Sequence, residues 1–131
     1  MSKFCPCGSL QAYTDCCGPY LAGQKPAPTP EALMRSRYTA FKRGKMDYIA
    51  KTQLDTAEAV GGKNASIHWL KLEILHTTLA PGGKAGVVEF KAYYQYRGEK
   101  HVLHEISQFR LEGLCWLYVD GEIMYQCCPG H

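Results

Sequence analysis

The sequence lacks the features that mark exported and membrane proteins. No window approaches the roughly 18 continuous apolar residues that a membrane helix needs. The amino terminus, MSKFCPCGS, has no apolar segment of a secretory signal. We therefore expect a cytoplasmic protein with no membrane partner. Because the cytosol is reducing, the high content of seven cysteines indicates metal binding before disulfides.

A strong excess of charge, internal repeats and low-complexity tracts are also missing. The formal net charge of +3 is small for a nucleic-acid reader, which usually gathers far more positive charge on one face, so nucleic-acid binding is not expected. The chain has 131 residues, 46% of them hydrophobic and 21% charged, which is typical of one globular domain with a core of its own.

Four of the cysteines form two close pairs, Cys5 with Cys7 and Cys16 with Cys17. Zinc prefers four ligands in a tetrahedron, and a short loop brings two pairs of thiolates together at low entropic cost. Ser9 can hydrogen-bond a thiolate or a backbone amide. Four sulfur ligands leave no position open for water, so the spacing predicts a structural Zn²⁺ site and not a catalytic one. A disulfide pair and free thiols are the alternatives.

The remaining chain divides by its pattern. Residues 1–20 are rich in cysteine and turns, residues 21–29 form a proline-containing connector, residues 30–126 are regular, and residues 127–131 form a tail. Thr29 is expected to cap a helix that begins at Pro30 and ends at Gly44. A second, shorter helix follows, whose apolar side is expected to contain Met46, Ile49, Ala50 and Leu54.

After the helices, the hydrophobic period changes from helical to two. The pattern predicts four strands: one with Leu70, Leu72 and Ile74 on one face, one with Val88 to Tyr96 on one face, one over residues 101–111, and one over residues 114–119 that ends at Asp120-Gly121. Turns are expected at Pro81-Gly82-Gly83, at residues 97–99 and at residues 112–113. Helices followed by an antiparallel meander indicate an α+β fold with the helices on one face of the sheet.

The segment CPCGS…YTDCC resembles the SEC-C motif, named for the zinc-binding tail of the SecA translocase, in which the metal is structural and the surface contacts the chaperone SecB. The motif usually carries Gly and Lys after the serine and lysines before its last pair. This chain has Leu10, Gln11 and Ala12 there, and Asp15 where lysine is common. The resemblance therefore implies zinc binding without the basic surface used for SecB.

The resemblance continues over nearly the whole chain. LMRSRYTAF at 33–41, Tyr48 with Thr52, Trp69 with Leu72, and LHEISQF…GLCWLYVDG at 103–121 are similar to the YchJ-like family of uncharacterised bacterial proteins. Its members join a SEC-C motif to a domain like nuclear transport factor 2 (NTF2), which implies a cone: a curved antiparallel sheet wrapped around amino-terminal helices. Many members end in a second SEC-C motif, which this chain lacks.

Cone folds often enclose a pocket, and some proteins of the superfamily are dehydratases or isomerases that use His and Asp. The candidate residues for such a pocket are His104 and Glu105, together with Arg35, Arg37, Tyr38, Tyr48 and His68. In a strictly alternating strand, Glu105 lies among apolar residues and needs a cation, for which Arg35 or Arg37 on the first helix is expected. The alternatives are a buried helix-to-sheet ion pair and an acid or base in a pocket. His104 must point to the opposite face.

Other residues that carry chemistry have ordinary explanations. Tyr93, Tyr94 and Tyr96, with Lys91 and Arg97 beside them, match a half-buried strand better than a base-stacking surface. His76 and His101 show no ligand spacing.

The three remaining cysteines are expected in different environments. Cys115 is expected in the core beside Trp116. Cys127 and Cys128 could supply a second metal site with His131, or have no such role.

Two classes of function follow from these observations. The first is a non-catalytic adaptor, with a zinc knuckle for contact with a protein partner and a cone that holds a partner or small ligand; it is favoured because no nucleophile, base and orienting group come together in the sequence. The second is a small-molecule enzyme with Glu105 or His104 as acid or base, which needs a pocket of a few hundred cubic ångströms. A closed cone that acts only through homo-oligomer surfaces is a third interpretation.

Overall fold

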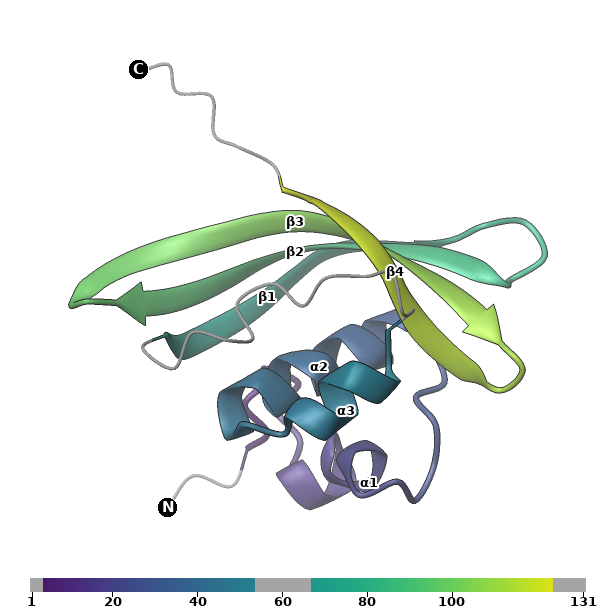
Figure 1. The fold of residues 1–131 in the computed structure, drawn as a ribbon, viewed down its shortest axis with the longest axis horizontal. Helices are drawn as coiled ribbons and strands as arrows, with labels where there is room; N and C mark the ends of the chain where they lie inside the picture. The colour runs from purple at the N-terminus through teal and green to yellow at the C-terminus, as the bar shows by residue number, and fades with distance from the viewer. Residues whose placement is uncertain (1–3, 54–66, 124–131) are drawn as a thin grey trace.

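The computed structural model describes residues 4–53 and 67–123. A curved antiparallel sheet lies over a layer of helices, which confirms the α+β prediction (Figure 1). In chain order the elements are the 3-10 turn η1 (Tyr13–Asp15), the helices α1 (Gly18–Leu21), α2 (Pro30–Arg43) and α3 (Met46–Lys51), and the strands β1 (His68–Leu79), β2 (Ala85–Tyr96), β3 (Glu99–Glu112) and β4 (Cys115–Ile123). The first helix ends at Leu21, inside the stretch predicted as connector.

Helix α2 begins and ends where its sequence signals predict. The Thr29 hydroxyl accepts a hydrogen bond of 3.0 Å from the amide of Ala32, which satisfies one of the amides that the first turn leaves without a partner. Gly44 ends the helix in the left-handed conformation, with φ of 75°, where a side chain would be strained. The buried residues of α2, among them Leu33, face the sheet and the amino-terminal segment.

The side of α3 that is buried differs from the prediction. The expected apolar side was Met46, Ile49, Ala50 and Leu54. Of these, Ile49 is buried, Met46 and Ala50 are exposed, and Leu54 lies outside the described residues. The helix is only six residues long, so it has no continuous stripe to bury. It packs instead through Ile49 and Tyr48, whose hydroxyl lies 2.7 Å from Ser36 Oγ on α2.

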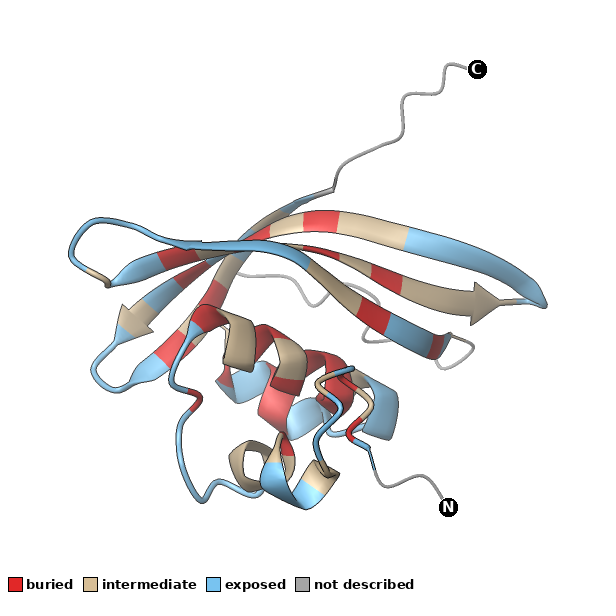
Figure 2. Ribbon diagram, turned by 180° about the vertical axis from the view of Figure 1, so that it is seen from behind, coloured by how far each residue is buried: buried red, intermediate tan, exposed pale blue. Residues whose placement is uncertain are grey.

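The four strands form a meander in the order β1-β2-β3-β4, with every neighbouring pair antiparallel. The predicted inner face of β2 is confirmed: Val88, Phe90 and Ala92 are buried beneath the helices, and Tyr94 is half-buried. Figure 2 shows that buried residues occur in the middle of the strands and along α2. The core therefore lies between one face of the sheet and the helical layer.

Strand β1 departs from strict alternation at Leu70. The prediction placed Leu70 on the same face as Leu72, but the pairing with β2 shifts between Trp69 and Lys71. This bulge adds one residue, so Trp69 and Leu72 turn inward while Leu70 is 46% exposed. Trp69 thereby packs its ring against Tyr38 and Phe41 of α2.

Strand β4 is longer than predicted, because it continues through Asp120-Gly121 to Ile123. Its pairing with β3 shifts register between Gln108 and Phe109, whose partners are Asp120 and Tyr118. The amide of Tyr118 donates a 2.8 Å hydrogen bond to the carbonyl of Thr52. The end of α3 is thus fastened to the edge strand of the sheet.

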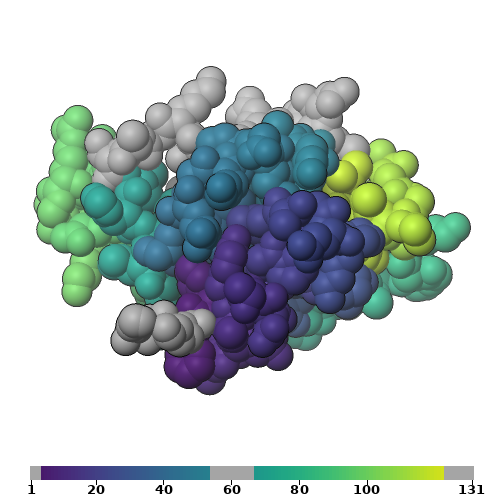
Figure 3. All heavy atoms as spheres, turned by 90° about the horizontal axis from the view of Figure 1, so that it is seen from below, coloured from purple at the N-terminus to yellow at the C-terminus, as the bar shows by residue number. Residues whose placement is uncertain are grey.

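The amino-terminal segment packs on the helical side of the molecule. Seen from below, it lies beside α1 and against the other helices (Figure 3). The segment that carries the cysteine pairs is therefore part of the compact body of the protein.

Among the described helices, none has the length and apolarity needed to cross a membrane.

Candidate metal centre

The first cysteine pair lies on a tight loop whose shape depends on Gly8. The amide of Gly8 donates to the carbonyl of Cys5 at 3.3 Å, and the amide of Cys5 donates to the carbonyl of Gln11 at 2.7 Å. Gly8 has a φ of 86°, and a Cβ at this position would lie 3.1 Å from the carbonyl oxygen of Leu72 on β1. Glycine therefore allows both the left-handed turn and the close approach of the loop to the sheet.

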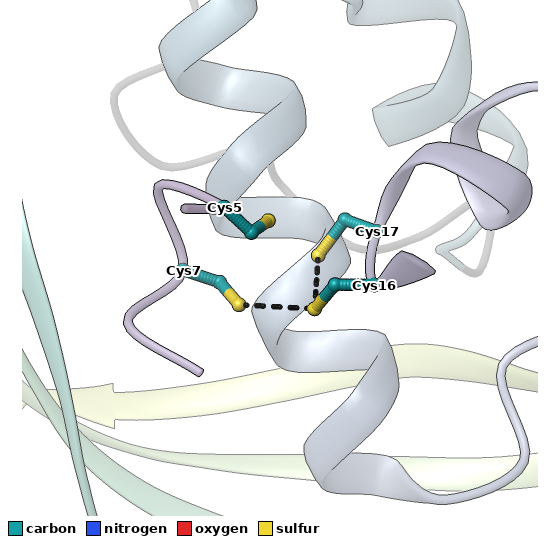
Figure 4. A group of neighbouring side chains, drawn as sticks. All are labelled: Cys5, Cys7, Cys16 and Cys17. Atoms are coloured by element: carbon teal, nitrogen blue, oxygen red, sulfur yellow. Dashed lines mark hydrogen bonds between the residues drawn. The ribbon is translucent and has the colours of Figure 1, made fainter. Parts of the chain in front are cut away.

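The four sulfur atoms of the cysteine pairs come together. They all lie within 4.8 Å of one another, with Cys7 Sγ at 3.6 Å and Cys17 Sγ at 3.8 Å from Cys16 Sγ (Figure 4). A tetrahedral zinc with bonds of 2.3 Å needs sulfur atoms about 3.8 Å apart. Cys5, Cys7 and Cys17 are buried and Cys16 is half-buried. The cluster could therefore hold a metal ion in a closed site.

Neighbouring polar groups hold the thiols in place. Ser9 Oγ lies 3.0 Å from Cys16 Sγ, as the sequence indicated. On α2, the Thr39 hydroxyl donates to Cys17 Sγ at 3.5 Å and lies 3.6 Å from Cys5 Sγ. These are the contacts expected of groups that orient metal ligands. The role of Thr39 was not predicted, because no sequence signal says which face of α2 meets the cysteine loop.

The electrostatics of the cluster favour a cation at its centre. Hydrogen bonds from the Cys17 and Cys7 thiols lower the pKa of Cys5. The hydrogen bonds of Cys17 to Cys5 and Cys7, together with burial, raise the pKa of Cys17, and burial raises that of Cys16 to about 11. The Cys5 thiolate is thus stabilised by its neighbours, whereas ionisation of Cys16 and Cys17 is opposed. A bound divalent metal ion would remove this conflict.

No ion pair joins Glu105 to Arg35 or Arg37 on α2, so the predicted ion pair is wrong. Arg35 pairs with Glu31 at 2.9 Å and donates from Nη1 to the carbonyl of Cys7 at 2.7 Å. Arg37 is buried, and burial lowers its pKa to about 10. It points toward the end of α3 and makes no ion pair with any described residue. Arg35 therefore hydrogen-bonds the cysteine loop, and Arg37 hydrogen-bonds the end of α3.

Glu105 is nevertheless buried, with 4% of its surface exposed. Its Oε2 atom accepts hydrogen bonds from Ser107 Oγ at 2.8 Å and from the Tyr118 hydroxyl at 3.2 Å. Ser107 lies two residues after Glu105 in β3. Because residues two apart in a strand lie on the same face, the sequence pattern could have predicted this contact. Tyr118 lies on β4, and its contact depends on a strand register that the sequence does not specify.

A cavity of about 50 Å³ lies between α2 and the inner face of the sheet. Glu105, Ser107, Arg37 and Tyr118 line its polar part. Its apolar part is lined by Met34, Tyr38, Phe41, Trp69, Phe90 and Leu103. The cavity is smaller than the few hundred cubic ångströms that the enzyme interpretation required.

His104 points away from this cavity, as predicted for a neighbour of Glu105 in a strand. Its Nε2 lies 2.7 Å from Glu89 on β2, and both side chains are partly exposed. The other candidate histidines, His68, His76 and His101, are exposed. His101 stacks on Tyr94 with ring centroids 5.2 Å apart. None of the described histidines lines the cavity.

The remaining candidates have distinct environments. The hydroxyl of Tyr48 bonds Ser36, whereas the buried hydroxyl of Tyr38 has no hydrogen-bond partner among the described residues. Tyr93, Tyr94 and Tyr96 are all half-buried, as a half-buried strand predicts.

The placement of Cys115 in the core is wrong: it is an exposed free thiol at the start of β4, because Trp116 takes the inward position. Cys127, Cys128 and His131 lie outside the described residues, and their second metal site is not tested.

Comparisons with known proteins agree with this architecture. The family model described as the middle NTF2-like domain of YchJ matches residues 29–121. A UPF0225 protein from Shewanella sp. (strain MR-7) is 39% identical over 98% of this chain and 85% of its own length.

Two solved structures are also similar. A SEC-C motif containing protein from Rhodopseudomonas palustris has 36% identity and a TM-score of 0.84 over 93% of this chain and 99% of that one. Another SEC-C motif containing protein, from Psychrobacter arcticus, has 29% identity and a TM-score of 0.77 over 96% and 85%. With its cysteine knuckle and NTF2-like cone, the chain belongs to the YchJ-like family of bacterial proteins, the uncharacterised UPF0225 proteins.

Proposed function

We propose that the protein is a non-catalytic binding protein in which one structural Zn²⁺ joins the cysteine knuckle (residues 5–17) to the cone, and the cone holds a small ligand. The observation that carries the proposal is the convergence of four sulfur atoms, three of them buried against α2. Four thiolates complete a tetrahedral shell and leave no site for a substrate or an activated water. The metal would therefore have a structural role and no catalytic one.

Binding is favoured over catalysis by the arrangement around Glu105. A general acid or base acts with a second group within hydrogen-bond reach of the reacting atoms. His104 lies on the other face of the sheet and is bonded to Glu89. Within the described chain, the cavity offers Glu105 no histidine, thiol or lysine as a partner. The hydroxyl partner of Glu105, Tyr118, is a weak acid whose pKa burial raises further, so the side chains present suit ligand binding better than acid–base chemistry.

Metal analysis of the purified protein tests the zinc centre. The parent is expected to contain one zinc per chain, and Cys7→Ser close to none, because a hydroxyl is a poor replacement for a buried thiolate. Cys115→Ser is the matched control, since this exposed cysteine lies outside the cluster; it should keep the full zinc content. Absence of zinc from freshly reduced parent protein would refute the proposal.

The knuckle is also our proposed surface for a protein partner. Leu10 on the knuckle and Phe4 directly before it are large apolar side chains with 72% and 61% of their surfaces accessible. Large exposed apolar groups are one mark of contact sites. Leu10 has a φ of 66°, a conformation that asparagine tolerates well. Leu10→Asn therefore removes the apolar group without adding strain.

A pull-down with these variants tests the contact. We expect a partner captured by the parent to be lost with Leu10→Asn while the zinc content stays at one per chain. Loss with Cys7→Ser as well would show that the metal shapes the surface. Capture that is unchanged in Leu10→Asn would exclude Leu10 from the contact.

A further inference from the structure

Glu105 is a buried carboxylate that makes no ion pair with a described residue, although its charge opposes the lowering of the pKa of the nearby Arg37. Only 4% of its surface is exposed. No nitrogen of a described Lys, Arg or His side chain lies within 4.0 Å of its carboxylate oxygens. Both of its hydrogen bonds, from Ser107 and Tyr118, end on Oε2. The other oxygen, Oε1, accepts no hydrogen bond from the described residues, and the residue lines the cavity. A buried charge with an open acceptor is costly unless a donor meets it.

The nearest buried cation is already committed elsewhere. Arg37 Nη1 donates to the carbonyl of Ile49 at 3.1 Å and to both oxygens of Thr52, at 3.2 Å and 2.8 Å. Its Nη2 donates to Gln53 at 3.1 Å. The guanidinium also lies over the ring of Tyr118, 4.8 Å from the centroid. Tyr118 therefore contacts both Arg37 and Glu105, and the carboxylate keeps an acceptor for another group.

Aromatic rings surround the space in front of this carboxylate. Phe41, Trp69 and Phe90 line the same cavity; Trp69 is 5.9 Å from Tyr38 and 6.2 Å from Phe41 between ring centroids. Aromatic faces attract cations and exclude water from the space between them.

Arg37 also lines the cavity, but its N–H groups donate to residues at the end of α3. The charged atom of the lining left without a partner among the described residues is Glu105 Oε1, so the site suits an ammonium group better than an anion.

We propose that the cavity binds the protonated amine of a small aliphatic molecule, with the ammonium on Glu105 Oε1 and a short carbon chain against Phe41 and Trp69. This inference rests on the ligand-binding role proposed above for the cone. The volume of about 50 Å³ sets the size, because one water needs about 10–15 Å³ of such space. An ammonium with a chain of a few carbons fits this volume.

Titration of the full-length, zinc-loaded protein with three size-matched probes tests the proposal. The probes are propylammonium, propan-1-ol and propanoate. The readout is the indole N–H signal of Trp69 in nitrogen–proton correlation spectra, assigned with a Trp116→Phe variant, because Trp116 does not line this cavity. We expect propylammonium to shift the Trp69 signal, with an affinity at least tenfold above those of the alcohol and the carboxylate.

Two isosteric variants locate the charge that is responsible. Glu105→Gln removes the charge and keeps the shape, so it should weaken propylammonium binding at least tenfold and leave the weak binding of propan-1-ol unchanged. Glu89→Gln is the matched control, because Glu89 is a carboxylate on the outer face, bonded to His104. It should bind propylammonium as the parent does.

Several outcomes would overturn the proposal. Equal binding of the three probes would show an unselective apolar cavity, tighter binding of propanoate would assign the site to Arg37, and no shift with any probe would show that only water enters. The comparison of probes on the parent remains decisive if Glu105→Gln does not fold. Zinc content is measured on the same samples, so a missing metal centre is distinguished from a cavity that rejects amines.

Discussion

At the scale of single residues, two buried tyrosines of the core differ in one respect. Tyr38 and Tyr48 are 2% and 5% exposed. Tyr48 bonds Ser36, which donates in turn to the carbonyl of Leu33 at 2.8 Å. Tyr38 leaves its hydroxyl without a partner in the described part of the chain, and burial raises its pKa. A buried hydroxyl without a hydrogen bond destabilises the folded state, whereas a hydrogen-bonded one stabilises it.

We expect the two tyrosines to respond in opposite directions to the loss of the hydroxyl. Tyr38→Phe should raise the free energy of unfolding by about 1 kcal/mol, because it removes a desolvated group that makes no bond. Tyr48→Phe should lower it by about 1 kcal/mol, because Ser36 loses its donor. Denaturant unfolding of both variants beside the parent provides the measurement. A destabilised Tyr38→Phe would mean that its hydroxyl has a bound water or ligand as its partner.

The residue scale also shows how far the sequence could identify the candidate sites. The cysteine pairs were found because zinc ligands have a characteristic spacing. The inward position of Glu105 and the outward position of His104 followed from strand alternation. The ion pair of Glu105 with an α2 arginine was wrong, because the direction of a long side chain depends on what competes for it. Here the carbonyl groups of α3 compete for Arg37.

At the scale of elements, α2 connects the two parts of the molecule. It carries Thr39 and Arg35 toward the cysteine loop, and Met34, Arg37 and Phe41 toward the cavity. Its position depends on a cap at the end nearest the connector. Thr29 supplies this cap through its side-chain oxygen.

Loss of this cap should destabilise the whole protein. Thr29→Ala removes the acceptor for the amide of Ala32 and should lower the free energy of unfolding by about 1 kcal/mol. Thr29→Ser keeps the oxygen and should stay within a few tenths of a kcal/mol of the parent. Chemical denaturation with both variants distinguishes the lost hydrogen bond from lost packing of the methyl group. Equal destabilisation by the two substitutions would assign the effect to the methyl group.

The positions of the helices and strands were predicted better than which of their residues are buried. Both main helices and all four strands were expected, since caps, turns and periodicity are local signals. The bulge at Leu70 was not, because an extra residue in one strand is defined by its pairing with another strand. The same limit applies to β4, whose extension past Gly121 depends on its register with β3. Gly121 lies so close to Glu105 that a Cβ would clash with Oε2, a reason for glycine that only the structure provides.

At the scale of the whole molecule, the knuckle and the cone share one core. The buried cluster that contains Leu33 and Val88 also includes Cys5, Cys7 and Cys17. A structural metal contributes its binding free energy to folding when the site exists only in the folded state. The proposed zinc should therefore stabilise the sheet and helices as well as the loop that holds it.

Removal of zinc by a chelator should lower the melting temperature of the entire protein. We expect a decrease of about 10 °C in the parent, measured by circular dichroism of the sheet and helices under reducing conditions. The Cys7→Ser variant, which lacks the metal, should show no response to the same treatment. Two separate transitions, with that of the cone unchanged, would show that the knuckle and the cone unfold independently.

The unequal burial of the four cysteines also has a consequence for the rates at which the centre reacts. Cys7 is completely shielded and Cys5 and Cys17 nearly so, whereas Cys16 is partly open. An incoming thiol-reactive oxidant or competing chelator can therefore begin only at Cys16. Attack on the other three sulfur atoms has to wait until the knuckle lifts from α2. Exchange of the proposed metal should thus be governed by the frequency of this opening, which would protect the site kinetically.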